Sequence, residues 1–453
     1  MGENAEAMEN LSGIILAKSI ELLEKASLCD RCLGRFFARL GFSLTNKVRG
    51  ESLKTLLCMK SSILIERGAE EEGLRILSLL ARTGFKPAVE HLAKLGIEPP
   101  TITPCEVCRG ILDNELRVLV DKALEMLSSY EYTTFLVGCK VPGAIVEKED
   151  SLRSLVGVEW SESIKREINR EAGTIIASKT GKNASFQNPD LLVVLNFHDM
   201  SVDVKSSPIF IYGRYRKLVR GIPQSKWICP KCRGLGCEEC GGSGKKYPTS
   251  VEELVTEPIL QAFRGVKAKF HGAGREDIDV RVLGPGRPFV VEVVEPRVRS
   301  VDLEELQEVM NDRSRGLVEV EGLTYTDRSM IGLLKLSAKV KEKTYYAVVK
   351  ASSPVPLDKL KELEAFFSGT TIRQRTPIRV LHRRADKLRL KKVYEVKVEP
   401  LDSDKFKALI RCQGGLYIKE LVNGDNGRTT PSFQEYLGVD LQVLELDVID
   451  VQE

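Results

Sequence analysis

A carboxylate in a glycine-rich turn is the first feature of this chain that could do chemistry. Asp277 ends the turn Gly274-Arg275-Glu276-Asp277, directly before an alternating run that predicts a strand. Such turns form for local hydrogen-bonding reasons, so a plain loop is the simplest interpretation. The same geometry would also hold a carboxylate rigidly at the edge of a cleft. Asp279 is expected on the same strand face as Asp277 and is the alternative candidate for the reactive carboxylate.

Two later segments carry the aromatic and cationic groups that could complete such a site. Residues 343–349 alternate as a strand, so one of their two tyrosines, Tyr345, can face a pocket while the other packs. Residues 411–419 contain paired glycines, which let the backbone approach a ligand closely, followed by Tyr417 and Lys419.

These three segments, in this order, resemble the active-site motifs of pseudouridine synthases. The resemblance implies that Asp277 is the catalytic carboxylate and that Tyr345 lies over the target base. It makes Lys419 the cation beside the Asp. Arg275 in the turn and Tyr417 are further candidates for substrate binding, although Tyr417 could instead buttress the site.

The chemistry that such a site must perform can be stated from the substrate. Conversion of uridine to its C-glycoside breaks the bond from N1 to C1′, rotates the uracil and joins C5 to C1′, and it needs no cofactor. An ionised carboxylate could add to the sugar or the base, or stabilise positive charge at C1′ and help remove a proton. The residues do not choose among these routes. A flat ring such as that of Tyr345 would support a base taken out of its stack.

Eight of the eleven cysteines fall into Cys-x-x-Cys pairs, the spacing of zinc knuckles. Two of the pairs form a compact set whose glycines free backbone amides to turn towards the sulfurs, and the other two are far apart in the sequence. Four thiolates close a coordination sphere, so we predict two structural zinc ions and none for catalysis. The compact set is Cys229, Cys232, Cys237 and Cys240, and the split set is Cys29, Cys32, Cys105 and Cys108.

Basic side chains are concentrated in two runs, although the net charge is only +4. Ten Lys or Arg lie in residues 205–246 against two acidic residues, and nine lie in residues 373–392 against one. Such density is typical of phosphate contacts, and with tyrosines nearby it favours an RNA partner. The sequence shows no membrane span, signal peptide or nucleotide-binding loop, and it does not identify protein partners. We therefore expect a cytoplasmic protein without a nucleotide cofactor.

Changes of hydrophobic period divide the 453 residues into three expected domains of an α+β, multidomain fold. The first domain, residues 1–110, carries helical spacing over about residues 9–95 and the split cysteine set. Residues 111–248 alternate helical and strand-like runs and end in the compact cysteine set, which indicates an α/β module. Residues 249–453 predict a mixed, largely antiparallel sheet with flanking helices.

Over nearly its whole length the chain resembles one family, the archaeal-type tRNA pseudouridine synthases of the Pus-ten family. Residues 189–194, the turn at His198-Asp199 and the segment 212–216 resemble the second half of a THUMP RNA-binding domain. The family resemblance implies a tRNA partner and modification of uridines fifty-four and fifty-five in the T-arm. One departure is Lys419, which stands where a better-known tRNA synthase family carries Arg and lacks the planar fork of that residue.

Three alternatives stay open. Tandem Cys-x-x-Cys-x-Gly-x-Gly is also the zinc repeat of a J-domain co-chaperone, but no His-Pro-Asp occurs in the chain. A THUMP-containing tRNA thiolase or methyltransferase would need an ATP or methyl-donor loop, and none is recognisable. A tRNA-binding protein without catalysis is the third alternative.

Overall fold

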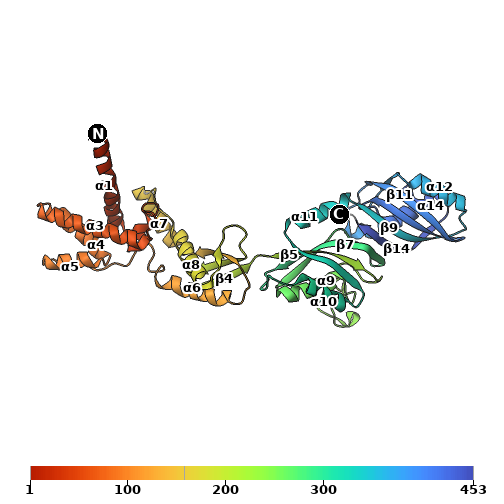
Figure 1. The fold of residues 1–453 in the computed structure, drawn as a ribbon, viewed down its shortest axis with the longest axis horizontal. Helices are drawn as coiled ribbons and strands as arrows, with labels where there is room; N and C mark the ends of the chain where they lie inside the picture. The colour runs from red at the N-terminus through yellow and green to blue at the C-terminus, as the bar shows by residue number, and fades with distance from the viewer. Residues whose placement is uncertain (1, 158, 452–453) are drawn as a thin grey trace. The chain divides into compact units, whose positions relative to one another are not determined.

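The computed structural model describes residues 2–157 and 159–451, which form two compact units divided at Ser207 and Pro208 (Figure 1). The first unit begins with helices, as the helical spacing predicts. Thr45 caps one of them by accepting a hydrogen bond from the Val48 backbone, and three glutamates fill the first turn of the next, where they complement its dipole. These helices are α1 (Gly2–Lys25), α2 (Asp30–Arg35), α3 (Asn46–Glu66), α4 (Glu70–Arg82) and α5 (Lys86–Lys94).

A four-stranded sheet with three helices completes the first unit. Strand β1 runs parallel to β2 and β3, and β4 is antiparallel to β3, in the order β2-β1-β3-β4. The inward residues of β3 alternate with half-buried ones, as expected for a sheet covered on one face. The elements are α6 (Asn114–Leu127), β1 (Thr134–Lys140), α7 (Gly143–Val156), α8 (Ile164–Thr180), β2 (Asn183–Ala184), β3 (Leu191–Asn196) and β4 (Ser201–Ser206).

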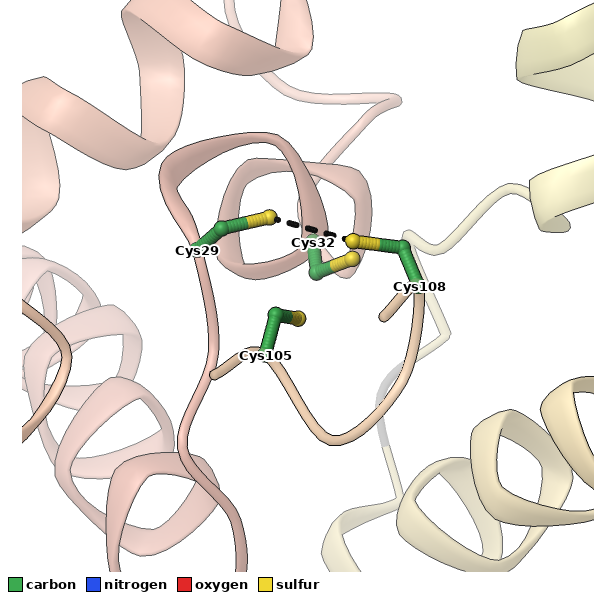
Figure 2. A group of neighbouring side chains, drawn as sticks. All are labelled: Cys29, Cys32, Cys105 and Cys108. Carbon is green, nitrogen blue, oxygen red and sulfur yellow. Dashed lines mark hydrogen bonds between the residues drawn. The ribbon is translucent and has the colours of Figure 1, made fainter. Parts of the chain in front are cut away.

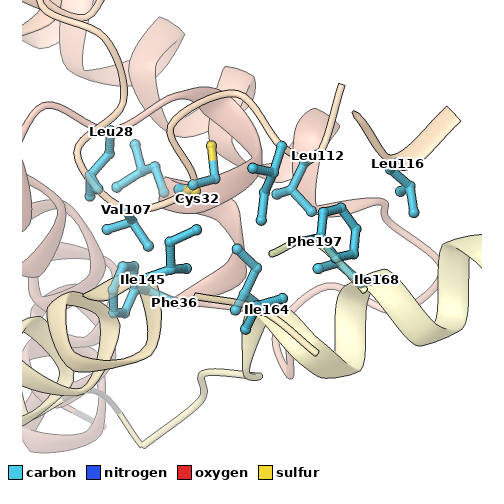
Figure 3. Close-up of a cluster of buried hydrophobic side chains, with 14 of the residues drawn as sticks. Leu28, Cys32, Phe36, Val107, Leu112, Leu116, Ile145, Ile164, Ile168 and Phe197 are labelled. Atoms are coloured by element: carbon cyan, nitrogen blue, oxygen red, sulfur yellow. The ribbon is translucent and has the colours of Figure 1, made fainter. Parts of the chain in front are cut away.

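One hydrophobic core runs through both parts of this unit (Figure 3). Leu28 and Phe36 from the helical part belong to the same buried cluster as Ile145, Ile164 and Phe197 from the α/β part. A buried ion-pair network also joins them. The Arg35 guanidinium lies 2.9 Å from a carboxylate oxygen of Glu149 on α7 and 3.0 Å from one of Glu167 on α8. The expected boundary at residue 110 therefore does not separate two cores.

The second unit is built on one large, almost entirely antiparallel sheet, which confirms the expected fold class. Its strand order is β13-β10-β11-β12-β9-β14-β7-β5-β8, with β6 paired to β7, and only β14 and β7 run parallel. The strands are β5 (Ile209–Lys217), β6 (Lys267–Gly272), β7 (Val280–Val294), β8 (Val318–Thr326), β9 (Glu342–Ala351), β10 (Thr371–Gln374), β11 (Arg389–Asp402), β12 (Lys405–Gln413), β13 (Thr429–Thr430) and β14 (Leu441–Val451).

Helices flank this sheet, and they are more numerous than the two that the sequence predicts. Helix α9 packs against β6 and α10 against β8, while α12 lies on β11. The helices are α9 (Val251–Phe263), α10 (Leu303–Ser314), α11 (Ser329–Val340), α12 (Leu357–Phe367), α13 (Ile418–Asn423) and α14 (Phe433–Leu437), with the short 3-10 helices η1 (Glu238–Cys240) and η2 (Ile378–Arg383).

Residues 208–248 belong to the second unit, whereas the sequence placed them in the middle domain. The physical reason is β5, which is hydrogen-bonded between β7 and β8 in the large sheet. Its residues 212–216, which resemble part of a THUMP domain, therefore lie in an internal strand of this sheet. The compact cysteine set follows β5 and lies in the same unit.

Candidate active site

A buried network holds the turn that precedes Asp277. The Glu276 carboxylate accepts hydrogen bonds from the Tyr215 hydroxyl at 2.8 Å and from the Gln224 amide at 3.2 Å, and it lies 3.0 Å from the Arg287 guanidinium. All four side chains are buried. The Gln224 amide also donates to the Gly274 carbonyl at 3.0 Å, so the network grips both ends of the turn.

A lysine on β5 secures the backbone at Asp277 itself. Lys217 Nζ donates to the carbonyls of Ile222, Asp277 and Ile278 at 2.9 to 3.1 Å. Burial lowers the pKa of this amine to about 8. The backbone of Asp277 is therefore fixed by the Lys217 amine, while the Asp277 side chain is about 30 % exposed.

The cation that forms an ion pair with Asp277 is Arg379. Arg379 Nη1 lies 2.8 Å from Asp277 Oδ2, and its Nε lies 2.6 Å from the buried Glu420 carboxylate. Although partial burial lowers the pKa of Arg379, its ion pairs with Glu420 and Asp277 raise it above the ordinary value. Glu420 thus positions the guanidinium that faces the carboxylate.

Lys419 pairs with the alternative carboxylate instead. Its Nζ lies 2.6 Å from Asp279 Oδ2. Burial raises the pKa of Asp279, but the hydrogen bond and charge of Lys419 outweigh it and lower that pKa. The resemblance placed Lys419 beside Asp277; in the structure Lys419 lines the same cavity but pairs with Asp279, and Arg379 of η2 pairs with Asp277.

Asp277 and Asp279 share a small cavity of about 200 Å³, which we call the Asp277 cavity. Arg275, Arg379 and Lys419 face it together with the two carboxylates. Pro223, Gln224, Trp227, Glu276 and Ile278 complete its lining.

A larger cavity of about 830 Å³ contains the two predicted tyrosines, and we call it the Tyr345 cavity. Arg275 lines both cavities, so they meet at this side chain. Six cations and no acidic residue line the Tyr345 cavity. The lining consists of Gly272, Gly274, Arg275, Lys335, Lys343, Tyr345, Arg384, Arg389, Leu390, Lys391, Gly414, Gly415, Leu416 and Tyr417.

Lys343 and Tyr345 reach this cavity from the same face of β9, because they lie two residues apart on a strand. Lys343 is 5 % exposed, and its amine has no hydrogen-bond or ion-pair partner among the described residues. Burial lowers the pKa of its amine to about 7. Burial also raises the pKa of Tyr345, so this phenol stays neutral at physiological pH.

Tyr417 contacts residues of the second basic run, including Arg379, the partner of Asp277. Gln374 fixes its backbone by accepting from its N–H at 2.8 Å and donating to its carbonyl at 2.9 Å. The Arg379 guanidinium lies 5.9 Å from the centre of the Tyr417 ring, a cation–π distance. Arg384 donates weakly to its hydroxyl at 3.4 Å.

The split cysteines form one cluster in the first unit (Figure 2). Figure 2 shows the side chains of Cys29 and Cys32, at the start of α2, converging with those of Cys105 and Cys108 from a later loop, and the four sulfur atoms lie within 4.8 Å of one another. Cys32 and Cys108 are buried within the core. The four thiols therefore fit a tetrahedral metal ion, as the spacing predicts.

The compact cluster in the second unit has the same sulfur spacing in a more exposed loop. Backbone N–H groups donate to its sulfurs, from Gly236 to Cys232 at 3.3 Å and from Gly244 to Cys240 at 3.2 Å. Both glycines have positive φ, and a Cβ at either would meet a backbone oxygen at 2.6 Å or less. The expectation that glycines free amides for the sulfurs is confirmed.

Sequence reasoning missed Arg379 and Glu420. Arg379 was one of nine cations in a run, and nothing local distinguished it. Glu420 offered a signal, because it interrupts the otherwise apolar buried face of α13 formed by Ile418, Leu421 and Val422. A charge on such a face needs a partner.

The two basic runs also differ in the structure. In the first, Arg216 pairs with Glu319 and Arg220 with Asp447, so much of its charge is balanced inside the protein. The second supplies Arg384, Arg389 and Lys391 to the Tyr345 cavity. Among the described helices, none is both long and apolar enough to cross a membrane.

Comparisons with known proteins agree with this architecture. The family model described as "Pus10, C-terminal" matches residues 210–452, and "Pus10 THUMP domain, archaeal" matches residues 119–196. The chain of a Cbf5-Nop10-Gar1 complex covers 44 % of this chain at 21 % identity with a TM-score of 0.27, which is too low to support an argument.

Three curated relatives carry the name tRNA pseudouridine synthase Pus10. The protein from Thermofilum pendens is 45 % identical, with 95 % of this chain and 94 % of that one covered. Those from Methanothrix thermoacetophila and Methanocaldococcus jannaschii are 43 % and 44 % identical, each with 96 % and 94 % covered. These matches decide against a co-chaperone, a thiolase or a methyltransferase. The chain belongs to the Pus10 family of pseudouridine synthases, and it is an isomerase.

Proposed function

We propose that this protein isomerises uridine to pseudouridine in the T-arm of tRNA, at uridines fifty-four and fifty-five, with Asp277 as the catalytic carboxylate. The observation that carries the proposal is the ion pair of Asp277 with Arg379 at a cavity that meets the cation-lined Tyr345 cavity. The names of the relatives support tRNA as the substrate. The T-arm positions are those that the resemblance to the family implies.

Charge supports a polyanionic substrate. Six of the described residues that line the Tyr345 cavity are Lys or Arg and none of them is Asp or Glu, so the cavity suits the phosphates of an RNA strand. Arg275 then stands between the phosphate-binding cations and the reacting carboxylate. An RNA strand in the larger cavity would deliver its extruded nucleotide to Asp277.

Asp277 acts as a carboxylate whose orientation is set by its neighbours. Lys217 holds its backbone carbonyl, and Arg379 holds its side-chain oxygen. The reaction breaks the N1–C1′ bond, forms the C5–C1′ bond, and moves one proton from C5 to N1, so no atom is gained or lost. Asp277 either adds to the substrate or stabilises C1′ during this exchange, and the geometry is compatible with both.

Tyr345 supports the extruded uracil. Its ring lines the larger cavity, and its neutral phenol adds no charge against the base. Tyr417, from the segment of residues 411–419, contacts the same nucleotide, and the Arg379 guanidinium lies at a cation–π distance from its ring. Lys419 contributes through Asp279, which it holds at the rim of the Asp277 cavity.

Two structural zinc ions complete the proposal, one in each four-cysteine cluster. Tetrathiolate sites are closed, so neither ion would take part in the reaction. Elemental analysis of protein purified under reducing conditions should find two zinc ions per chain. Cys232→Ser should lose one of them, and Cys58→Ser, which removes a cysteine outside both clusters, should lose none. A chain without zinc contradicts this part of the proposal.

The deciding experiment compares two neighbouring carboxylates that are paired with different cations. Asp277→Asn preserves size and removes charge, and it should lower turnover by several orders of magnitude with tRNA affinity nearly unchanged. Asp279→Asn is the matched control, expected within about tenfold of the parent. The measurement is tritium release from tRNA labelled at C5 of uridine, with mapping of the product. An active Asp277→Asn and an inactive Asp279→Asn would reverse the assignment, and two active variants would sink it.

A further inference from the structure

An aromatic wall stands at the edge of the Asp277 cavity, in the segment that carries the compact cysteine cluster. Trp227 lines this cavity together with Asp277. Its ring packs edge-to-face against Tyr247, with 5.6 Å between ring centres. Lys246 Nζ lies 5.3 Å from the centre of the Trp227 ring and 5.8 Å from that of Tyr247. We call Trp227, Lys246 and Tyr247 the Trp227 wall.

The loop that carries the compact cluster closes on itself directly beside this wall. The Lys246 backbone N–H donates to the Trp227 carbonyl at 2.9 Å, and the Cys229 N–H donates to the Gly244 carbonyl at 2.8 Å. Ile228 and Lys245 form an antiparallel bridge between these two bonds. The two ends of the loop are thus paired through their backbones, and this pairing places the rings of Trp227 and Tyr247 next to each other.

The other side of the wall is tied to the catalytic turn. Gln224, three residues before Trp227, donates to the Gly274 carbonyl and to the Glu276 carboxylate. The guanidinium of Arg275, in that same turn, lies 5.9 Å from the centre of the Trp227 ring. A change in the loop of the compact cluster is therefore connected to Asp277 through one short, well-anchored segment.

The chemistry of the wall suits an unpaired nucleotide. Trp227 and Tyr247 are only partly buried, so their rings border solvent and do not fill a core. Aromatic faces accompanied by cations are the usual platform for single-stranded bases, because the ring stacks on the base and the cation meets the phosphate. Two cations, Lys246 and Arg275, accompany this ring.

We infer that the Trp227 wall is a stacking site for an unpaired nucleotide adjacent to the target uridine, and that the metal in the compact cysteine cluster holds this wall in place. The inference rests on the proposed function, since it takes RNA as the substrate. It gives the compact cluster, which lies in the same unit as Asp277, a role in substrate positioning.

Fluorescence tests the wall directly, because the chain has two tryptophans and Trp160→Phe leaves Trp227 as the single reporter. Titration with an RNA hairpin of T-arm sequence should quench this emission as a base stacks on the ring. In the same background, Trp227→Ala should weaken hairpin binding about tenfold or more, and Trp227→Phe should restore most of it. Unchanged emission, or parent-like affinity of Trp227→Ala, overturns the stacking site.

The metal link has its own test. Cys232→Ser should shift Trp227 emission to longer wavelength and weaken hairpin binding as much as Trp227→Ala does. The combined variant should be no weaker than either alone, because both changes remove one element. Cys58→Ser is the control, with parent-like emission and affinity. A metal-depleted Cys232→Ser with unchanged emission and affinity, or a parent without metal in this cluster, overturns the link.

Failure of this inference is distinguishable from failure of the proposed function. If the parent forms no pseudouridine in a tRNA transcript, the proposed function fails whatever Trp227 does. If the parent is active and Trp227→Ala matches it in affinity and turnover, only the stacking site fails.

Discussion

The two cavities of the second unit balance their charges in opposite ways. In the Asp277 cavity the carboxylates are paired, Asp277 with Arg379 and Asp279 with Lys419. Six cations line the Tyr345 cavity, its described lining residues include no Asp or Glu, and the Lys343 amine has no hydrogen-bond or ion-pair partner among the described side chains. Internal pairing orients a reacting group, whereas a cavity lined mainly by residues of one charge favours a ligand of the opposite charge. The difference separates a place for chemistry from a place for binding.

The largest effect should come from breaking the pairing in the Asp277 cavity. Arg379→Met removes the cation that orients Asp277, and we expect kcat to fall at least a hundredfold, as is common for a lost electrostatic contact at a reacting centre. Lys419→Met should cost about tenfold or less, because Lys419 holds Asp279. The measurement is single-turnover tritium release at saturating protein.

A control guards this comparison against a folding defect. Arg379→Met leaves the buried Glu420 without its partner, which is itself destabilising. The double variant Arg379→Met/Glu420→Gln removes both charges and should regain stability without regaining activity. A greater loss of kcat in Lys419→Met than in the double variant would contradict the assignment of Arg379.

Charge reversal in the Tyr345 cavity should impair binding more than turnover. Arg384→Glu/Arg389→Glu should weaken tRNA affinity about tenfold to a hundredfold and reduce the slope of log affinity against log salt by roughly 0.7 to 0.9 for each lost phosphate contact. Lys361→Glu, an exposed change on α12 outside the cavity, is the matched control. A salt dependence equal to that of the parent would show that this cavity does not hold phosphates.

Replacing Lys343 should make the protein more stable but weaken its binding of tRNA. Its folded pKa of about 7 lies below the ordinary value of 10.5, so the unfolded chain binds more protons between these limits. The stability penalty of Lys343 is therefore full below pH 7 and fades as the pH rises towards 10.5. Lys343→Met should raise the free energy of unfolding at about pH 6 by on the order of 2–4 kcal/mol, and by little at about pH 10.

Denaturant unfolding at both pH values measures this difference. Lys343→Met should also bind tRNA more weakly, as expected where function opposes stability. A variant less stable than the parent at the lower pH would mean that Lys343 has a partner in the folded protein.

The smallest effect should come from the hydroxyl of Tyr417. Its contact with Arg384 is long at 3.4 Å, while the ring keeps its place over Arg379. Tyr417→Phe should change KM less than about threefold, in line with a weak hydrogen bond between partly exposed groups. Tyr417→Leu, which removes the ring, should be the more damaging of the two in the same steady-state assay. Equal effects would show that the ring has no role.

Much of the fold followed from local patterns in the sequence. Helical spacing over about residues 9–95 predicted the helices of that segment, and alternation located β3 and β9. The Cys-x-x-Cys spacing identified both clusters, including the split one, because each pair already presents two sulfurs on one side of a turn. The placement of β5 was missed, because a strand pattern does not say which sheet its backbone will join.

At the candidate site, the sequence by itself determined which side chains share one face of a strand and which side chain a turn presents. Strand alternation alone put Lys343 and Tyr345 on one face, and the Gly-rich turn alone presented Asp277. Only the tertiary structure decided that Arg379 meets Asp277 and that Lys419 meets Asp279. The reason is physical. Periodicity determines which way a side chain points within one helix or strand. The partner of a charged group depends instead on where the fold places a distant segment and on how its long, flexible side chain then reaches the site.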